Sequence, residues 1–173
     1  MAYGPDNARV FLPEDVSVST VKFSPDGRMV SFLWKKDKEE RAVWGIPVDG
    51  GAQVKLAALE DAGVRSYAWA PDGNMLYLLA YPAPDKEREA EDKDGFDAVV
   101  YEEESRFNRL FSARLGDEVD ADPRELAIPG YVSTFQVAPN GRWAAVESAP
   151  TPQVDDSYTS KRVHIVDLAS GNV

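Results

Sequence analysis

The sequence predicts an all-β fold built from a repeated unit of about four short strands. Three observations support this prediction: a turn pattern occurs three times, short runs alternate polar and apolar residues, and glycine and proline are frequent. The 173 residues include 12 glycines and 12 prolines, which interrupt the chain too often for long helices. Hydrophobic residues make up 43% of the chain, which is enough for a packed core.

The turn pattern consists of proline, then aspartate or asparagine, then glycine, with apolar residues on both sides. It occurs in the segments 23–32, 69–78 and 137–146, which align without gaps. Proline presets φ at the first turn position, Asp or Asn accepts the next, and glycine takes a positive φ at no steric cost. Each segment therefore predicts a β-hairpin.

The spacing of these turns predicts the architecture. Gly27 and Gly73 lie 46 residues apart, whereas Gly73 and Gly141 lie 68 residues apart. The excess of 22 residues is close to the length of a charged stretch at 85–104, which indicates an insertion in the second repeat. A period in the mid-forties with about four strands is typical of a β-propeller blade. We therefore predict a partial β-propeller of about three four-stranded blades, that is, an incomplete ring.

The elements follow in order after an N-terminal extension at 1–15. Blade 1 (16–60) has expected strands at 19–23, 29–34, 42–48 and 53–56. Blade 2 (61–129) has them at 65–69, 75–81, 108–114 and 124–128, with a charged insertion at 82–105. Blade 3 (130–173) has them at 133–137, 143–147 and 162–167 and lacks a fourth strand. A helix is plausible only near 85–92, where helical propensity is high, but no apolar stripe is present there and we expect a mobile charged loop. Phe23 and Trp69 occupy matched repeat positions and are expected in the core.

The number of repeats is too small for a closed ring. Without the insertion about 151 residues remain, or roughly 3.3 repeats, whereas propellers usually have four to eight blades. The end blades would then expose apolar faces and unpaired strands. Three outcomes are open: the chain belongs to a longer polypeptide, a second copy completes the ring, or residues 9–12 pair with an open blade. We expect a fragment that associates with itself, with a stable open array of three blades as the alternative.

Composition argues against several functions. The net charge of −11 disfavours nucleic acids and anionic membranes as partners. Without cysteine the chain has no disulfide, thiolate or zinc-ribbon chemistry. No apolar run approaches the ~18–20 residues of a membrane helix. We expect a soluble protein with no metal and no cofactor. Its location stays open: cytoplasmic, or periplasmic or secreted if a signal peptide was removed.

The turn segments at 23–28 and 69–74 resemble the propeller blades of the prolyl oligopeptidase family of serine peptidases, which includes acylaminoacyl and dipeptidyl peptidases. Residues 97–111 and 155–167 also resemble segments of that family, and the resemblance covers roughly 16–173. In the family, the propeller adjoins an α/β-hydrolase domain and limits which peptides reach the catalytic serine. The resemblance implies a noncatalytic propeller fragment that gates peptide access. Related turns occur in the periplasmic TolB propeller, so a stand-alone protein-interaction module is the alternative.

The segment Tyr101-Glu-Glu-Glu104 is similar to the glutamate motif of dipeptidyl peptidase IV, in which two glutamates hold the free α-amino group of the substrate. The resemblance implies Glu103 and Glu104 as the substrate-binding residues of such an amine clamp. Paired carboxylates can hold an ammonium through charge-assisted hydrogen bonds. The alternative is a solvated acidic loop, because 85–104 contains ten acidic and three basic residues.

No catalytic residue is predicted in this chain. A hydrolase of this family needs a Gly-x-Ser-x-Gly segment, and none occurs here. The one histidine, His164, lies in an apolar strand, where we expect a structural role. The chain alone is therefore not expected to be an enzyme, whereas the resemblance implies that a parent protein is a serine peptidase. The expected partners are the remainder of the propeller and the hydrolase domain, or a second copy, with peptide as the substrate of the parent.

Overall fold

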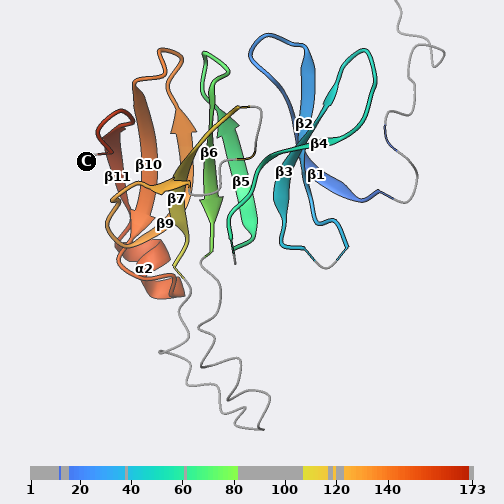
Figure 1. The fold of residues 1–173 in the computed structure, drawn as a ribbon. Coiled ribbons are helices and arrows are strands. Elements are labelled where there is room, and N and C mark those ends of the chain that lie inside the picture. Colours follow the sequence, from blue (N-terminus) through green and yellow to red (C-terminus); the bar gives the residue numbers. More distant parts are fainter. Residues whose placement is uncertain are drawn as a thin grey trace, which may run out of the picture.

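The protein folds into three antiparallel β-sheets that follow one another along the chain (Figure 1). This computed structural model describes residues 12, 16–37, 39–60, 62–81, 107–116, 119 and 123–171. Each sheet contains only strands that are consecutive in sequence, so every connection within a sheet joins neighbouring strands. The predicted all-β class is thereby confirmed.

The strands coincide closely with the apolar runs that predicted them. The first sheet contains β1 (Val18–Phe23), β2 (Met29–Trp34), β3 (Ala42–Pro47) and β4 (Val54–Ala57). The second contains β5 (Val64–Trp69), β6 (Met75–Ala80), β7 (Arg109–Arg114) and β8 (Arg124–Glu125). The third contains β9 (Tyr131–Val137), β10 (Trp143–Ala149) and β11 (Arg162–Asp167), without a fourth strand in the described residues.

Two local features differ from the sequence expectation. Strand β8 is only two residues long. Beyond it the backbone nitrogen of Leu126 still donates to the Leu110 carbonyl of β7, but the nitrogen of Ile128 donates to Leu126 within its own segment. A short helix, α2 (Val154–Thr159), occurs where none was expected. None of its residues is buried, so no apolar periodicity announces it. The stretch 85–92, where we expected a charged loop, lies outside the described residues.

The three hairpin turns have the same hydrogen bonds at each repeat. In the first, the Gly27 nitrogen donates to the Ser24 carbonyl over 2.9 Å and the Ser24 nitrogen donates to the Met29 carbonyl over 2.9 Å. The corresponding distances are 2.9 and 2.9 Å in the second turn and 2.9 and 2.8 Å in the third. The turn glycines have φ values of 70°, 75° and 69°, a region in which other residues are strained. The repeated sequence pattern therefore builds one repeated local structure.

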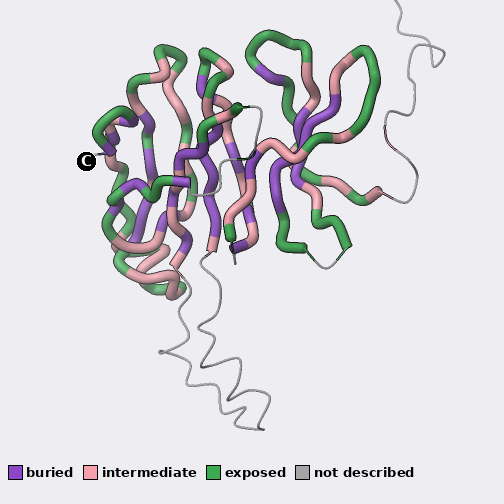
Figure 2. Tube along the Cα trace, viewed as in Figure 1, coloured by how far each residue is buried: buried purple, intermediate pink, exposed green. Residues whose placement is uncertain are grey.

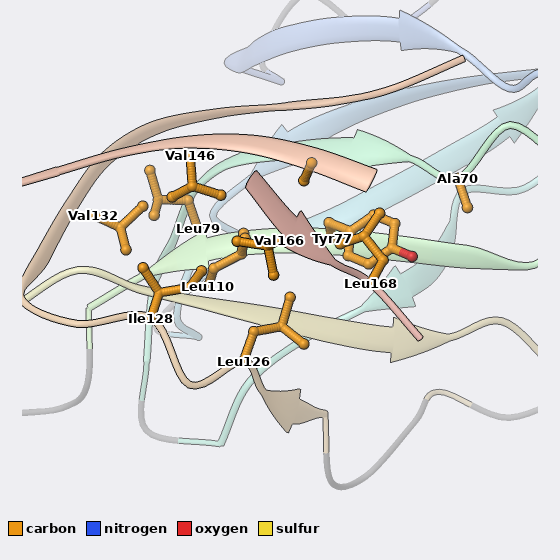
Figure 3. Close-up of a cluster of buried hydrophobic side chains, with 11 residues drawn as sticks. Ala70, Tyr77, Leu79, Leu110, Leu126, Ile128, Val132, Val146, Val166 and Leu168 are labelled. Atoms are coloured by element: carbon orange, nitrogen blue, oxygen red, sulfur yellow. The ribbon is translucent and has the colours of Figure 1, made fainter. Parts of the chain in front are cut away.

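Neighbouring sheets pack face to face through two apolar clusters, and buried residues run along their central strands (Figure 2). The cluster between the first and second sheets joins Leu33 and Val43 to Tyr67 and Leu76. The cluster between the second and third sheets includes Leu110 and is drawn in Figure 3. Successive side chains of a strand point to opposite faces of the sheet, and each cluster is formed by the side chains of one such face. The interior is thus a series of sheet-to-sheet interfaces.

Candidate functional site

The two glutamates that the family resemblance implies as an amine clamp, Glu103 and Glu104, lie outside the described residues. So does the whole of the insertion at 82–105 that contains them. The amine clamp therefore stays a prediction. The part of the chain that the structure describes contains three other features that bear on function: a buried polar network, two clefts between sheets, and two exposed end faces.

The polar network joins the first sheet to the second. Ser31 on β2 is completely buried, and its hydroxyl oxygen lies 2.8 Å from Tyr67 Oη and 2.8 Å from Trp69 Nε1 on β5. The Ser31 hydroxyl also donates to the carbonyl of Lys22 over 3.1 Å. A serine hydroxyl donates one hydrogen bond and accepts two, so the hydrogen-bonding capacity of this group is filled. The network fixes the positions of β1 and β5 relative to β2.

Lys22 and Tyr67 add further ties between β1 and β5. Lys22 Nζ donates to the Tyr67 carbonyl over 2.6 Å, and Tyr67 Oη lies 3.0 Å from the carbonyl oxygen of Thr20. Thr20 has a φ of 54° and lies at an irregularity in the pairing of β1 with β2. Burial raises the pKa of Tyr67 to about 12 and lowers the pKa of Lys22. Burial of the Tyr67 phenol thus opposes its ionisation, and its hydrogen bonds join the first sheet to the second.

A cleft of about 690 Å³ opens between the first and second sheets. It lies at the end of the sheets that carries the β1–β2 and β5–β6 turns. Its lining combines apolar side chains with charged groups of the turns, including Met29, Trp69, Val119 and Asp26. Ser24 Oγ donates to Asp26 Oδ1 over 2.6 Å, and this bond, with a further one from the Arg28 nitrogen, lowers the pKa of Asp26. The Asp26 carboxylate thus stabilises its own turn, and the cleft has the mixed apolar and polar lining that is common in binding sites.

A second cleft, of about 510 Å³, repeats this arrangement between the second and third sheets. At each junction the proline of one turn faces the glycine of the next. Pro25 Cδ lies 3.9 Å from the Cβ position of Gly73, and Pro71 Cδ lies 3.3 Å from that of Gly141. The turns of successive sheets therefore stack in a regular series.

The first sheet turns one face away from the second, and we call it the N-face. Strand alternation and pairing place a set of apolar residues on it: Val21, Phe23, Val30, Phe32, Trp34, Trp44 and Ile46. Phe32 and Ile46 are buried in a cluster against which Leu12 packs. Val21 and Phe23 are 62% and 65% exposed. The expectation that Phe23 belongs to the core is therefore wrong, because no other described sheet covers this side of β1.

The third sheet also turns one face away from the second, and we call it the C-face. It carries Thr134, Gln136, Ala145, Glu147, Val163 and Ile165. Val163 and Ile165, on the edge strand β11, are 70% and 57% exposed. Glu147 Oε1 accepts bonds from Lys161 Nζ (2.8 Å) and Ser133 Oγ (2.6 Å), which lower its pKa. Val163 and Ile165 thus form an exposed apolar pair on a face that also carries polar side chains.

His164 is half-buried on β11 and pairs in register with Val146 of the core, which is a structural position. Among the described residues, no three His, Cys, Asp or Glu side chains converge as metal ligands would. No helix in the described ranges is long and apolar enough to cross a membrane.

Sequence reasoning did not identify Ser31, Tyr67, Val163 or Ile165 as residues of interest. A lone serine in an apolar strand carries no signal, because its partners lie 36 and 38 residues away in sequence. For the first sheet a signal was present: the repeat alignment places Phe23 and Trp69 at equivalent positions, and the position is an interface position only where another sheet covers it.

No protein-family model matches this chain, and no curated protein matches it either. Several solved structures share its fold. The acylaminoacyl peptidase of Pyrococcus horikoshii aligns with a TM-score of 0.60 at 15% identity, over 93% of this chain and 25% of that one. The β-propeller domain of the Trilobed protease from Pyrococcus furiosus aligns with a TM-score of 0.55 at 12% identity, over 91% of this chain and 41% of that one. TolB from Acinetobacter baumannii aligns with a TM-score of 0.53 at 14% identity, over 91% of this chain and 31% of that one.

This chain therefore spans less than half the length of each of these structures. At such low identities the likeness shows the fold alone. The fold is a partial β-propeller, an open row of blades, as the spacing of the turns predicted.

Proposed function

We propose that this chain is part of the noncatalytic propeller of a serine peptidase similar to the prolyl oligopeptidase family, and that it limits the access of peptides to a hydrolase domain. The observation that carries the proposal is the match of 93% of this chain to an acylaminoacyl peptidase at a TM-score of 0.60. The structural likeness to a second protease propeller and the resemblance of the turn segments to the family support it.

In this proposal the amine clamp belongs to a loop of the second sheet. Glu103 and Glu104 belong to the connection between β6 and β7, which leaves the sheet at the end opposite the two clefts. A carboxylate pair there would meet a peptide at one mouth of the propeller and bind its ammonium group by charge-assisted hydrogen bonds. Such a pair would select peptides with a free N-terminus.

The test of the proposal begins with the complete source reading frame. If the parent is a peptidase of this family, the frame continues beyond Val173 and encodes a Gly-x-Ser-x-Gly segment. The product of that frame is then assayed on matched peptides with free and acetylated N-termini. A frame without the segment would eliminate the peptidase function.

The amine clamp is tested in the same product by the double variant Glu103→Gln/Glu104→Gln. Loss of two charge-assisted bonds predicts that kcat/KM for the free peptide falls by roughly 100-fold, while kcat/KM for the acetylated peptide is unchanged. The matched control, Glu87→Gln/Glu89→Gln, removes the same charge from the same insertion and is expected to have no effect. An unchanged preference for the free N-terminus in the first variant would eliminate the clamp.

The second candidate function is a stand-alone interaction module similar to TolB. It is favoured by the apolar side chains of α2, since Val154 and Tyr158 are 62% and 86% exposed and lie one helical turn apart. A source reading frame that encodes no hydrolase segment would favour this function over the first.

A further inference from the structure

We propose that two copies of this chain associate head to tail, with the N-face of each copy on the C-face of the other, and so close a ring of six blades. This proposal rests on the packing within the described residues and not on the peptidase function. Its partner is therefore defined by the repeat itself: a second copy of this chain.

The N-face exposes side chains at positions that are buried or half-buried in the second blade and packed against the preceding sheet in the third. Measured from the turn glycine, Val21 and Phe23 match Tyr67 and Trp69 of the second blade. Tyr67 is 1% exposed and Trp69 packs against the same interface cluster, because both contact the preceding sheet. The third blade follows the same rule with Phe135, which packs against the second sheet. The two exposed residues of the first blade are thus interface residues that lack their partner sheet.

The C-face also exposes a side chain at a position that is buried in the other two blades. In the third blade Val163 pairs with Glu147. The equivalent pairs are Val43 with Leu33 in the first blade and Leu110 with Leu79 in the second. Val43 and Leu110 are both 0% exposed, because each contacts the following sheet. Val163 is 70% exposed. The C-face is therefore the surface that receives a following blade.

The N-face and the C-face complement each other. In both interfaces inside the chain, the face of one sheet that corresponds to the C-face packs on the face of the next sheet that corresponds to the N-face. The C-face of one copy can therefore make the same contact with the N-face of another. The turn series continues across it: Pro25 faces Gly73 and Pro71 faces Gly141, whereas Gly27 has no neighbour within 4 Å of its Cβ position. Docking would bring Pro139 of one copy to Gly27 of the other.

Two copies have enough blades to close a ring. Head-to-tail contacts give a ring when the rotation closes and an open filament when it does not. Two copies contribute six sheets, and six blades fall within the usual range of four to eight. A ring of two copies uses the N-face and the C-face of both chains and leaves no end blade uncovered.

Two features make this contact weaker than the internal interfaces. Glu147 stands where the other blades have Leu33 and Leu79, so docking must partly desolvate a charged pair. Leu12 packs on the outer part of the N-face and must leave before a blade can cover it. The contact is therefore expected to depend on concentration, and Glu147→Leu, which restores the residue of the other repeats, should strengthen it.

Sedimentation equilibrium over a wide range of concentrations tests the proposal on the intact chain. The expected result is a reversible transition from 19.1 kDa to about twice that mass, with no larger species. The N-face variant Val21→Asp/Phe23→Asp and the C-face variant Val163→Asp/Ile165→Asp should each weaken association by roughly 100-fold or more. All four side chains are exposed, so the fold should survive, as circular dichroism would verify. The control Val154→Asp/Tyr158→Asp places the same charges on exposed apolar residues of α2 and should associate normally.

Mixing the two face variants gives the decisive result. Head-to-tail docking leaves one intact interface in the mixture, so a 1:1 heterodimer should form although neither variant associates alone. If instead one face variant still forms dimers alone, the contact joins like faces and the proposal is overturned. A chain that stays monomeric at every concentration, including with Glu147→Leu, would also overturn it. Neither outcome bears on the peptidase function, which the source reading frame tests separately.

Discussion

The buried hydroxyl of Ser31 offers the sharpest test of how the sheets are held together. Ser31→Ala removes the acceptor of the Trp69 indole and the donor to the Lys22 carbonyl, whereas Tyr67 Oη keeps the Thr20 carbonyl within reach. Each buried polar group that loses its partner costs ~1–3 kcal/mol. Since Trp69 is only half-buried, we expect the free energy of unfolding to fall by about 2–4 kcal/mol.

Urea unfolding followed by tryptophan fluorescence measures this change. With a slope of about 2 kcal/mol per molar urea, the midpoint should fall by about 1–2 M. The matched control is Ser112→Ala, because Ser112 is 7% exposed but makes only a 3.4 Å hydrogen bond to the Arg124 carbonyl. It should cost less than about 1 kcal/mol. Equal losses in the two variants, to within about 0.5 kcal/mol, would refute the role assigned to the network. Both are measured with Val163→Asp/Ile165→Asp present, which removes any contribution from association.

Two further predictions concern the turns and the pH dependence of stability. Gly141→Ala should destabilise the protein by about 1–2 kcal/mol more than Gly27→Ala in the same unfolding assay. Both have a positive φ, but only Gly141 would bring its new Cβ within 3.3 Å of Pro71; equal effects would contradict the stacking of the turns. Because the pKa of Tyr67 is raised to about 12 from 10.0, its contribution to stability is complete below pH 10 and is lost as pH rises towards 12. Tyr67→Phe should remove this part of the alkaline loss, and an unchanged profile between pH 10 and 12 would show that the phenol titrates normally when folded.

Local chemistry explains why so much of the fold was predictable. The three turns follow from proline, an Asx residue and glycine in succession, and these act within four residues of chain. The strands beside them are apolar runs whose limits differ from the prediction by two residues or fewer, except at the end of β8. There the decisive contact is a backbone bond from Ile128 to Leu126, which no side-chain pattern specifies.

Features that depend on distant segments were less predictable. Phe23 and Trp69 precede the same Pro-Asp-Gly turn, yet the exposure of Phe23 depends on whether another sheet lies against β1. Ser31 is indistinguishable in sequence from any serine in a strand until β5 is placed beside it. The candidate clamp at Glu103 and Glu104 comes from a resemblance to a motif, and its place relative to the sheets is still a prediction.

The two ends of the sheets differ in how the connections between strands are constrained. We call the end with the stacked turns the constant rim and the opposite end the variable rim. At the turn end, the contacts of Pro25 and Pro71 with the next glycine fix the step from blade to blade, so added residues there would disturb every later blade. The opposite end carries α2, at the lower left of Figure 1, and also the end of β6 and the start of β7, between which the insertion occurs in the sequence. The strands that flank α2 and the insertion pair without irregularity. New loops, epitopes or recognition segments should therefore be grafted at the variable rim, where their length is decoupled from the curvature of the array.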